Sequence, residues 1–154
     1  MRYLLVDRVT GWEPGRFMEG VKNVTMSEDF LEYHFPRFPV MPGSLLVEAL
    51  AQLAGWLEGA GTDFKSWLLL DRIRSVRYYE FALPGDQVAL RVEAAGEEEG
   101  LRLFKGVAAV EGKRRAVADF AARAVALADY EDPEEQRARF RVLRREAPFP
   151  EAMQ

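Results

Sequence analysis

The 154-residue sequence contains no cysteine and only one histidine, and both scarcities exclude kinds of chemistry. Without cysteine the chain has no disulfide, no thiolate nucleophile and no cysteine–zinc site. A metal site would then need a cluster of carboxylates, and none stands out along the sequence. Glycine-rich loops of the kinds that bind nucleotide phosphates are also missing. We therefore expect an activity that uses no metal and no other cofactor.

Long apolar runs and excess positive charge are absent as well. No apolar stretch reaches the roughly 18–20 residues that a bilayer requires, and charges at Asp7 and Arg8 come too early for a secretory signal. The formal net charge of −4 opposes general binding to nucleic-acid phosphates. With 49% hydrophobic residues, the chain can bury one core. We expect a cytoplasmic protein that binds neither membranes nor nucleic acid.

The single histidine, His34, opens a segment with three prolines in seven residues, Pro36 to Pro42. Proline fixes φ and donates no backbone hydrogen bond, so this segment should be a rigid connector. A helix should begin near residues 42–44, and its positions 45–57 are apolar on almost every face. Its polar exceptions are Ser44, Glu48 and Gln52, whose i, i+4, i+8 spacing places them on one stripe. We interpret Ser44 as a helix-start residue.

Together, His34 and Glu48 are the candidate catalytic residues. An imidazole titrates near neutral pH, and an isolated carboxylate on an apolar helix suits a proton donor or a holder of water. The two side chains are thus the parts of a general acid–base pair. Gln52, one turn beyond Glu48, is expected to support it by a hydrogen bond.

The rest of the chain alternates in the manner of strands. Strands are expected over residues 3–9, 15–26, 67–79, 87–94, 101–110 and 115–126. Ser27 should cap a short helical turn, residues 96–100 should form a solvated turn, and a charged helix should run over about 133–146 from an Asp132 cap. One apolar helix and a meander of strands indicate an α+β fold, an antiparallel sheet wrapped on a long central helix.

The segment HFPRFPVMPGSLLVEALAQLAG, residues 34–55, resembles a known family motif. Its pattern, HFPGxPVMPGVLxxEAxAQ, is central to the 3-hydroxyacyl-[acyl-carrier-protein] dehydratases of the FabZ and FabA type. Further matches occur in residues 4–9, 22–25 and 84–87, so that the resemblance covers about residues 2–125. It implies a hot-dog dehydratase domain over residues 1–128, followed by a charged helical extension over 129–154.

The resemblance also implies a reaction and an assembly. Such proteins convert 3-hydroxyacyl thioesters on acyl-carrier protein to trans-2-enoyl thioesters in fatty-acid synthesis. They work as homodimers, and some assemble as trimers of dimers. His34 of one subunit would meet Glu48 of the other, and the backbone N–H of Gly43 would bind the thioester oxygen. Candidates for an acyl tunnel are apolar residues of the motif, namely Phe35, Phe38, Met41 and Leu45, with Trp56 farther along the helix.

Some positions depart from the family pattern. Arg37 replaces a glycine, and Tyr79, Glu80 and Phe81 stand where a basic pair and a proline are usual. Carrier proteins are acidic, so docking on this acidic chain would need a local basic patch. The candidate arginines form two groups, either Arg72, Arg74 and Arg77 or the tail residues Arg137, Arg139, Arg141, Arg144 and Arg145.

Two other functions are compatible with the fold. A hot-dog thioesterase hydrolyses acyl thioesters with a helix carboxylate, and an accessory subunit would lack catalysis and pair with a second hot-dog chain. The His-Phe-Pro and Val-Met-Pro-Gly elements favour the dehydratase over the thioesterase. The presence of both His34 and Glu48 argues against a non-catalytic subunit.

Overall fold

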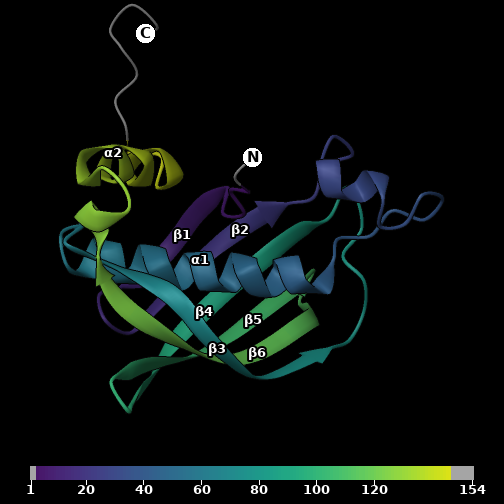
Figure 1. Ribbon diagram of the computed structural model, residues 1–154. Coiled ribbons are helices and arrows are strands. Elements are labelled where there is room, and N and C mark those ends of the chain that lie inside the picture. The colour runs from purple at the N-terminus through teal and green to yellow at the C-terminus, as the bar shows by residue number, and fades with distance from the viewer. Residues whose placement is uncertain (1–2, 147–154) are drawn as a thin grey trace, which may run out of the picture.

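The computed structural model describes residues 3–146 and consists of a long helix lying on an antiparallel sheet (Figure 1). The sheet order is β1-β2-β4-β5-β6-β3. The predicted α+β architecture with a central helix is confirmed. The elements in chain order are β1 Arg8–Glu13, β2 Phe17–Asn23, η1 Asp29–Glu32, α1 Gly43–Gly61, β3 Ser66–Tyr78, β4 Gln87–Glu98, β5 Leu101–Val110, β6 Lys113–Ala126, η2 Leu127–Asp129 and α2 Pro133–Leu143.

Helix α1 packs on the sheet through leucines that are removed from water almost completely. Leu46, Leu50 and Leu53 are at most 2% exposed. The sheet makes room for the helix where a side chain is missing, because a Cβ on Gly106 would lie 2.9 Å from Leu50 Cδ1. Each fully buried leucine contributes about 1.5–3 kcal/mol. This packing fixes the direction of α1 and hence the position of Glu48.

The ends of α1 are covered by different parts of the chain (Figure 1). At its C-terminal end, Phe140 of α2 stacks on Trp56 with 5.8 Å between ring centroids and meets Trp12 edge-on at 5.7 Å. Phe140 and Leu143 both belong to the buried core. The predicted cap is confirmed, since the Asp132 side chain accepts a hydrogen bond from the Glu134 N–H. At the N-terminal end lies the loop that carries His34.

Strand β3 forms one edge of the sheet and pairs with β6 alone. Its middle is exposed on both faces, including the apolar side chains of Leu70 and Ile73. A long edge strand with exposed apolar residues invites pairing with another chain. None of the helices in the described part of the chain is long and apolar enough to cross a membrane.

Several predicted boundaries were wrong. The first strand does not run over residues 3–9; it begins at Arg8 and passes through Thr10 and Gly11 with a bulge. The backbone at Leu5, before this strand, instead bonds to a side chain of α1, since the Leu5 N–H donates to Gln52 Oε1.

The ends of three further elements also differ from prediction. Strand β4 continues to Glu98, so the predicted turn over residues 96–100 shortens to Glu99 and Gly100, both at positive φ. Helix α2 ends at Leu143 rather than near residue 146. Ser27 does not cap η1, because its hydroxyl pairs with that of Thr25.

Candidate active site

The loop that carries His34 is closed by its own backbone hydrogen bonds. The N–H of Phe35 donates to the carbonyl of Phe38 at 3.0 Å, and the reverse bond measures 3.1 Å. The Val40 N–H donates to the His34 carbonyl at 2.8 Å. Arg37, at the tip, is absent from the described non-glycine residues with positive φ. The loop therefore does not require a glycine at position 37.

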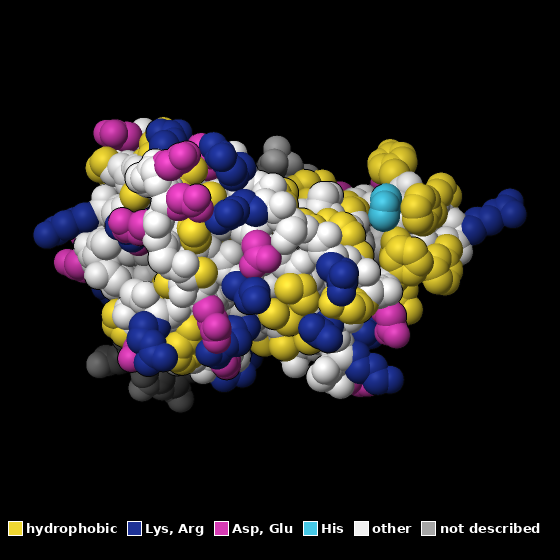
Figure 2. All heavy atoms as spheres, turned by 90° about the horizontal axis from the view of Figure 1, so that it is seen from below, with side chains coloured by type: hydrophobic (Ala, Val, Ile, Leu, Met, Phe, Trp, Pro, Cys, Tyr) yellow, Lys and Arg dark blue, Asp and Glu magenta, His cyan; other side chains and the backbone are white. Residues whose placement is uncertain are grey.

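The imidazole of His34 is oriented by the same loop. Its Nδ1 lies 3.1 Å from the Val40 carbonyl oxygen, which can only accept, so Nδ1 carries the proton. In the neutral ring, Nε2 then keeps a free lone pair. The ring stacks on Phe35 with 4.3 Å between centroids. Figure 2 shows the histidine at the surface beside hydrophobic side chains.

His34 lines a cavity of about 660 Å³ at the start of α1, together with Met41, Gly43 and residues 78–82. Gly43 is needed for its shape, because a Cβ there would lie 2.5 Å from Tyr78 Cε1. Partial burial raises the pKa of the Tyr78 phenol above its ordinary value.

The first turn of α1 adds a positive electrostatic end to this cavity. The N–H groups of Gly43 and Ser44 precede the first helical hydrogen bond, in which the Leu45 N–H donates to the Pro42 carbonyl. The helix dipole reinforces their partial positive charge. Such an end can stabilise an oxygen that gains negative charge.

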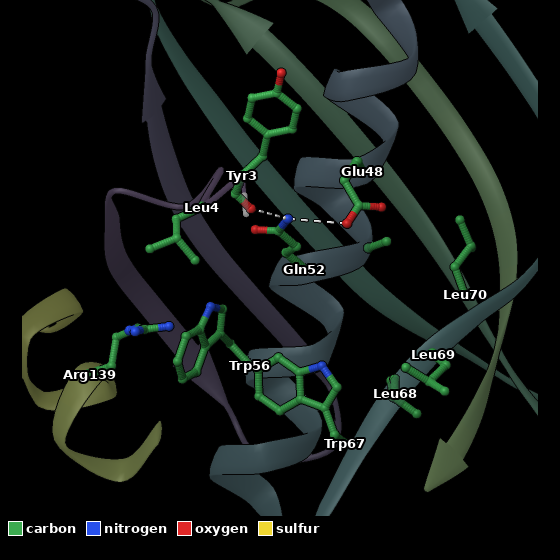
Figure 3. A pocket seen from close by; sticks show the side chains of 11 residues that line it. Tyr3, Leu4, Glu48, Gln52, Trp56, Trp67, Leu68, Leu69, Leu70 and Arg139 are labelled. Carbon is green, nitrogen blue, oxygen red and sulfur yellow. Dashed lines mark hydrogen bonds between the residues drawn. The ribbon is translucent and has the colours of Figure 1, made fainter. Parts of the chain in front are cut away.

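Glu48 lines a different cavity, of about 410 Å³, on the side of α1 shown in Figure 3. Gln52 Nε2 donates to Glu48 Oε1 at 3.1 Å and to the Tyr3 carbonyl at 3.0 Å. Gln52 Oε1 accepts from the Leu5 N–H at 2.9 Å. The amide thus joins the carboxylate to the N-terminal segment and restrains both.

Within one chain the two candidate catalytic residues do not share a cavity. The structure groups Gly43 and Met41 with His34, and it groups Gln52 and Trp56 with Glu48. The other predicted tunnel residues lie elsewhere: Leu45 packs at the edge of the core, whereas Phe35 and Phe38 are about half exposed.

Tyr78 and Arg139 were not predicted to line a cavity, and the sequence suggested Arg139 only as one of the arginines for carrier docking. Tyr78 ends β3 and contacts Gly43, and Arg139 of α2 lines the cavity of Glu48. Neither belongs to the motif of residues 34–55. Tertiary contacts alone bring them in, so no local pattern could have indicated them.

The segment that departs from the family pattern is held by the start of β6. Glu80 pairs with Arg115 at 3.0 Å, and the Arg114 guanidinium lies over the ring of Tyr79. Phe81 meets Phe38 edge-on with 6.3 Å between centroids. These contacts form one wall of the His34 cavity.

Comparisons with known proteins agree on family and fold. A profile described as a FabA-like domain matches residues 1–119. The 3-hydroxyacyl-[acyl-carrier-protein] dehydratase FabZ of Nitratidesulfovibrio vulgaris is 44% identical over 119 residues, which cover 75% of this chain and 77% of the relative. The protein of that name from Proteus mirabilis is 43% identical over 119 residues, covering 72% and 76%.

Among solved structures, a hot-dog-like protein from Thermanaerovibrio acidaminovorans aligns with a TM-score of 0.62 at 19% identity. The alignment covers 83% of this chain and 91% of that chain. The predicted hot-dog fold is confirmed.

Proposed function

Because the chain belongs to the FabA-like family, with FabZ dehydratases as relatives, we propose that it dehydrates 3-hydroxyacyl thioesters on acyl-carrier protein in fatty-acid synthesis. The product is the trans-2-enoyl thioester. The observation that carries the assignment is the 44% identity to a named dehydratase over three quarters of the chain. The oriented imidazole of His34 supplies the chemistry that this reaction needs.

The reaction breaks a C–H bond and a C–O bond and forms one C=C bond. His34 Nε2 accepts the α-proton, since the Val40 carbonyl holds the proton of the ring on Nδ1. Glu48, restrained by Gln52, delivers a proton to the leaving hydroxyl, which departs as water. The Gly43 N–H, at the positive end of α1, stabilises the enolate-like thioester oxygen.

A homodimer would unite the two halves of this site. His34 and Glu48 line separate cavities of one chain, which supports a site completed by a second copy. The exposed edge of β3, with Leu70 and Ile73, is suited to pair with the same strand of that copy. Three such dimers could assemble further, as the resemblance to the family implies.

Complementation tests the shared site directly. Each of the variants His34→Ala and Glu48→Gln should be inactive alone. A refolded equimolar mixture should regain about a quarter of wild-type activity, because half of the dimers are hybrid and each hybrid has one intact site of two. Native mass spectrometry would verify the hybrid dimers, because the two substitutions give the subunits different masses. No recovery in verified hybrids would place both residues of one site in the same chain.

The activity itself is tested with a 3-hydroxyacyl thioester of acyl-carrier protein, followed by enoyl absorbance and mass spectrometry. We expect the enoyl thioester from the wild type only, with His34→Ala as the control. Release of free acid would indicate the thioesterase instead. No reaction with the carrier or coenzyme A thioester would favour an accessory subunit.

Docking of the carrier is best supported beside the His34 cavity. Arg37 is exposed at the tip of the loop, and Arg77 is exposed next to Tyr78, which lines the cavity. In the tail, Arg137 already pairs with Asp63 and Glu134. Reversing the charge of both Arg37 and Arg77 should raise KM for the acidic carrier substrate and remove the salt dependence of KM. An unchanged KM would move docking elsewhere.

A further inference from the structure

Arg139 is a basic residue placed in a cavity that is otherwise apolar at that end. It comes from α2, beyond the part of the chain that the family profile matches. Figure 3 shows its guanidinium pointing toward Trp56, on the opposite side of the cavity from Leu69 and Leu70. The cavity between Arg139 and Glu48 is lined by apolar side chains. These are the indoles of Trp56 and Trp67, Leu4, and the three consecutive leucines of β3, Leu68 to Leu70.

Arg139 as a residue is only partly buried, but one nitrogen of its guanidinium is buried without an acceptor. Arg139 Nη1 is buried and has no hydrogen-bond partner among the described residues. Two nearby arginines differ, since Arg137 of α2 pairs with Glu134 and Arg144, the residue after α2, pairs with Glu146. A buried donor without an acceptor is costly, more so when it is charged. The site is therefore suited to an anionic group that the described residues do not supply.

We propose that Arg139 binds a carboxylate at the far end of the acyl chain, so that this cavity selects 3-hydroxyacyl thioesters with an anionic terminus. The inference rests on the proposed function, which places the reacting end of the substrate at Glu48. The methylene chain would then lie along Trp56 and Trp67, and its terminal carboxylate would accept from the guanidinium. A methyl terminus would instead leave the buried Nη1 without an acceptor, so the cavity should favour an anionic terminus over a methyl terminus on a chain of equal length.

Binding can be measured without any turnover, because two indoles line the cavity. Tryptophan fluorescence is titrated with octanoate and with 1-octanol, which match in chain length and differ in terminal charge. We expect the wild type to bind octanoate about tenfold more tightly than 1-octanol. In Arg139→Met this preference should disappear, and Arg139→Lys should keep part of it.

Arg141→Met is the matched control, since Arg141 lies exposed on the same helix. It should keep the wild-type preference, and thermal melting should show that all variants are folded. Equal affinity of the wild type for both probes, or a preference that survives in Arg139→Met, would overturn the assignment.

Kinetics then test the consequence for specificity. Two 3-hydroxyacyl carrier thioesters of equal length are compared, one ending in a carboxylate and one in a methyl group. The ratio of kcat/KM values should favour the carboxylate in the wild type and fall about tenfold in Arg139→Met. An unchanged ratio contradicts the role of Arg139. If the wild type dehydrates neither thioester, the proposed function fails, whereas the fluorescence result still decides whether Arg139 binds a carboxylate.

Discussion

The two cavities on α1 are built from different kinds of sequence. The cavity of His34 is formed by two segments of the chain, the loop and first turn of α1 over residues 34–46 and the segment over residues 78–82. The cavity of Glu48 collects residues from the N-terminal segment, α1, β3 and α2. Residues within one motif provide the reactive groups, whereas segments far apart in sequence complete both cavities, and more of these segments meet around Glu48.

We therefore expect substitutions around His34 and substitutions around Glu48 to have different effects. Changes at residues 34–38 of the loop should alter the rate of reaction while leaving stability nearly intact, because these side chains are partly or fully exposed, in contrast to the buried Val40 and Met41. Changes around Glu48 should affect stability, substrate choice and rate together, because the same side chains pack the core and line the cavity.

His34→Ala should have the largest effect. We expect kcat to fall by about 10²–10⁴-fold, the usual contribution of a general acid or base. The free energy of unfolding should change by less than about 0.5 kcal/mol, because the side chain is only half buried. Urea denaturation and steady-state kinetics measure the two quantities. Tyr33→Ala, an exposed neighbour, is the control. A large loss of stability in His34→Ala would show that the His34 loop also supports the fold.

Phe140→Ala should show the opposite behaviour. Removing a ring that stacks on Trp56 and meets Trp12 should cost about 3–5 kcal/mol of unfolding free energy. Selectivity at the Glu48 cavity should weaken as α2 loosens. Chemical denaturation followed by tryptophan fluorescence measures the loss, with exposed Val142→Ala as the control. Wild-type stability would show that α2 does not support this end of α1.

Gln52→Ala tests whether the Glu48 side combines support with chemistry. The substitution removes the donor to Glu48 and the acceptor of the Leu5 N–H, so that both effects should appear together. We expect a loss of about 1–3 kcal/mol in stability and a measurable decrease in kcat. Amide hydrogen exchange at Leu5 reports the N-terminal contact. A change in stability with no change in kcat would make Gln52 purely structural.

Tyr78→Phe should have the smallest effect and concerns pH. Burial raises the pKa of Tyr78 in the folded protein, so the protonated phenol is favoured by folding. Its contribution to stability is present below the ordinary tyrosine pKa and is lost as pH rises through the folded-state pKa. The wild type should therefore lose slightly more stability in alkaline solution than Tyr78→Phe does. Thermal melts across that pH range compare the stability of the wild type with that of Tyr78→Phe. The same loss of melting temperature with rising pH in both proteins would contradict the raised pKa of Tyr78.

Much of the fold was predictable because its signals are local. Proline spacing predicted the rigid connector before α1, and the apolar run with its stripe at Ser44, Glu48 and Gln52 predicted a buried helix with one polar line. Alternation placed β5 over residues 101–110 as observed. The first strand was misplaced because the backbone of Tyr3 and Leu5 bonds to a glutamine of α1, and pairing with β2 begins only with the Asp7 N–H.

The sequence by itself determined the family, the hot-dog architecture and the identity of the candidate acid–base pair. These depend on residue types and short spacings within one segment. Only the tertiary structure decided that His34 and Glu48 line different cavities, that Tyr78 rests on Gly43 and that Arg139 enters the cavity of Glu48. Such contacts join residues far apart in the chain, and they are fixed by the packing of α1 and α2 on a common core, which no local pattern encodes.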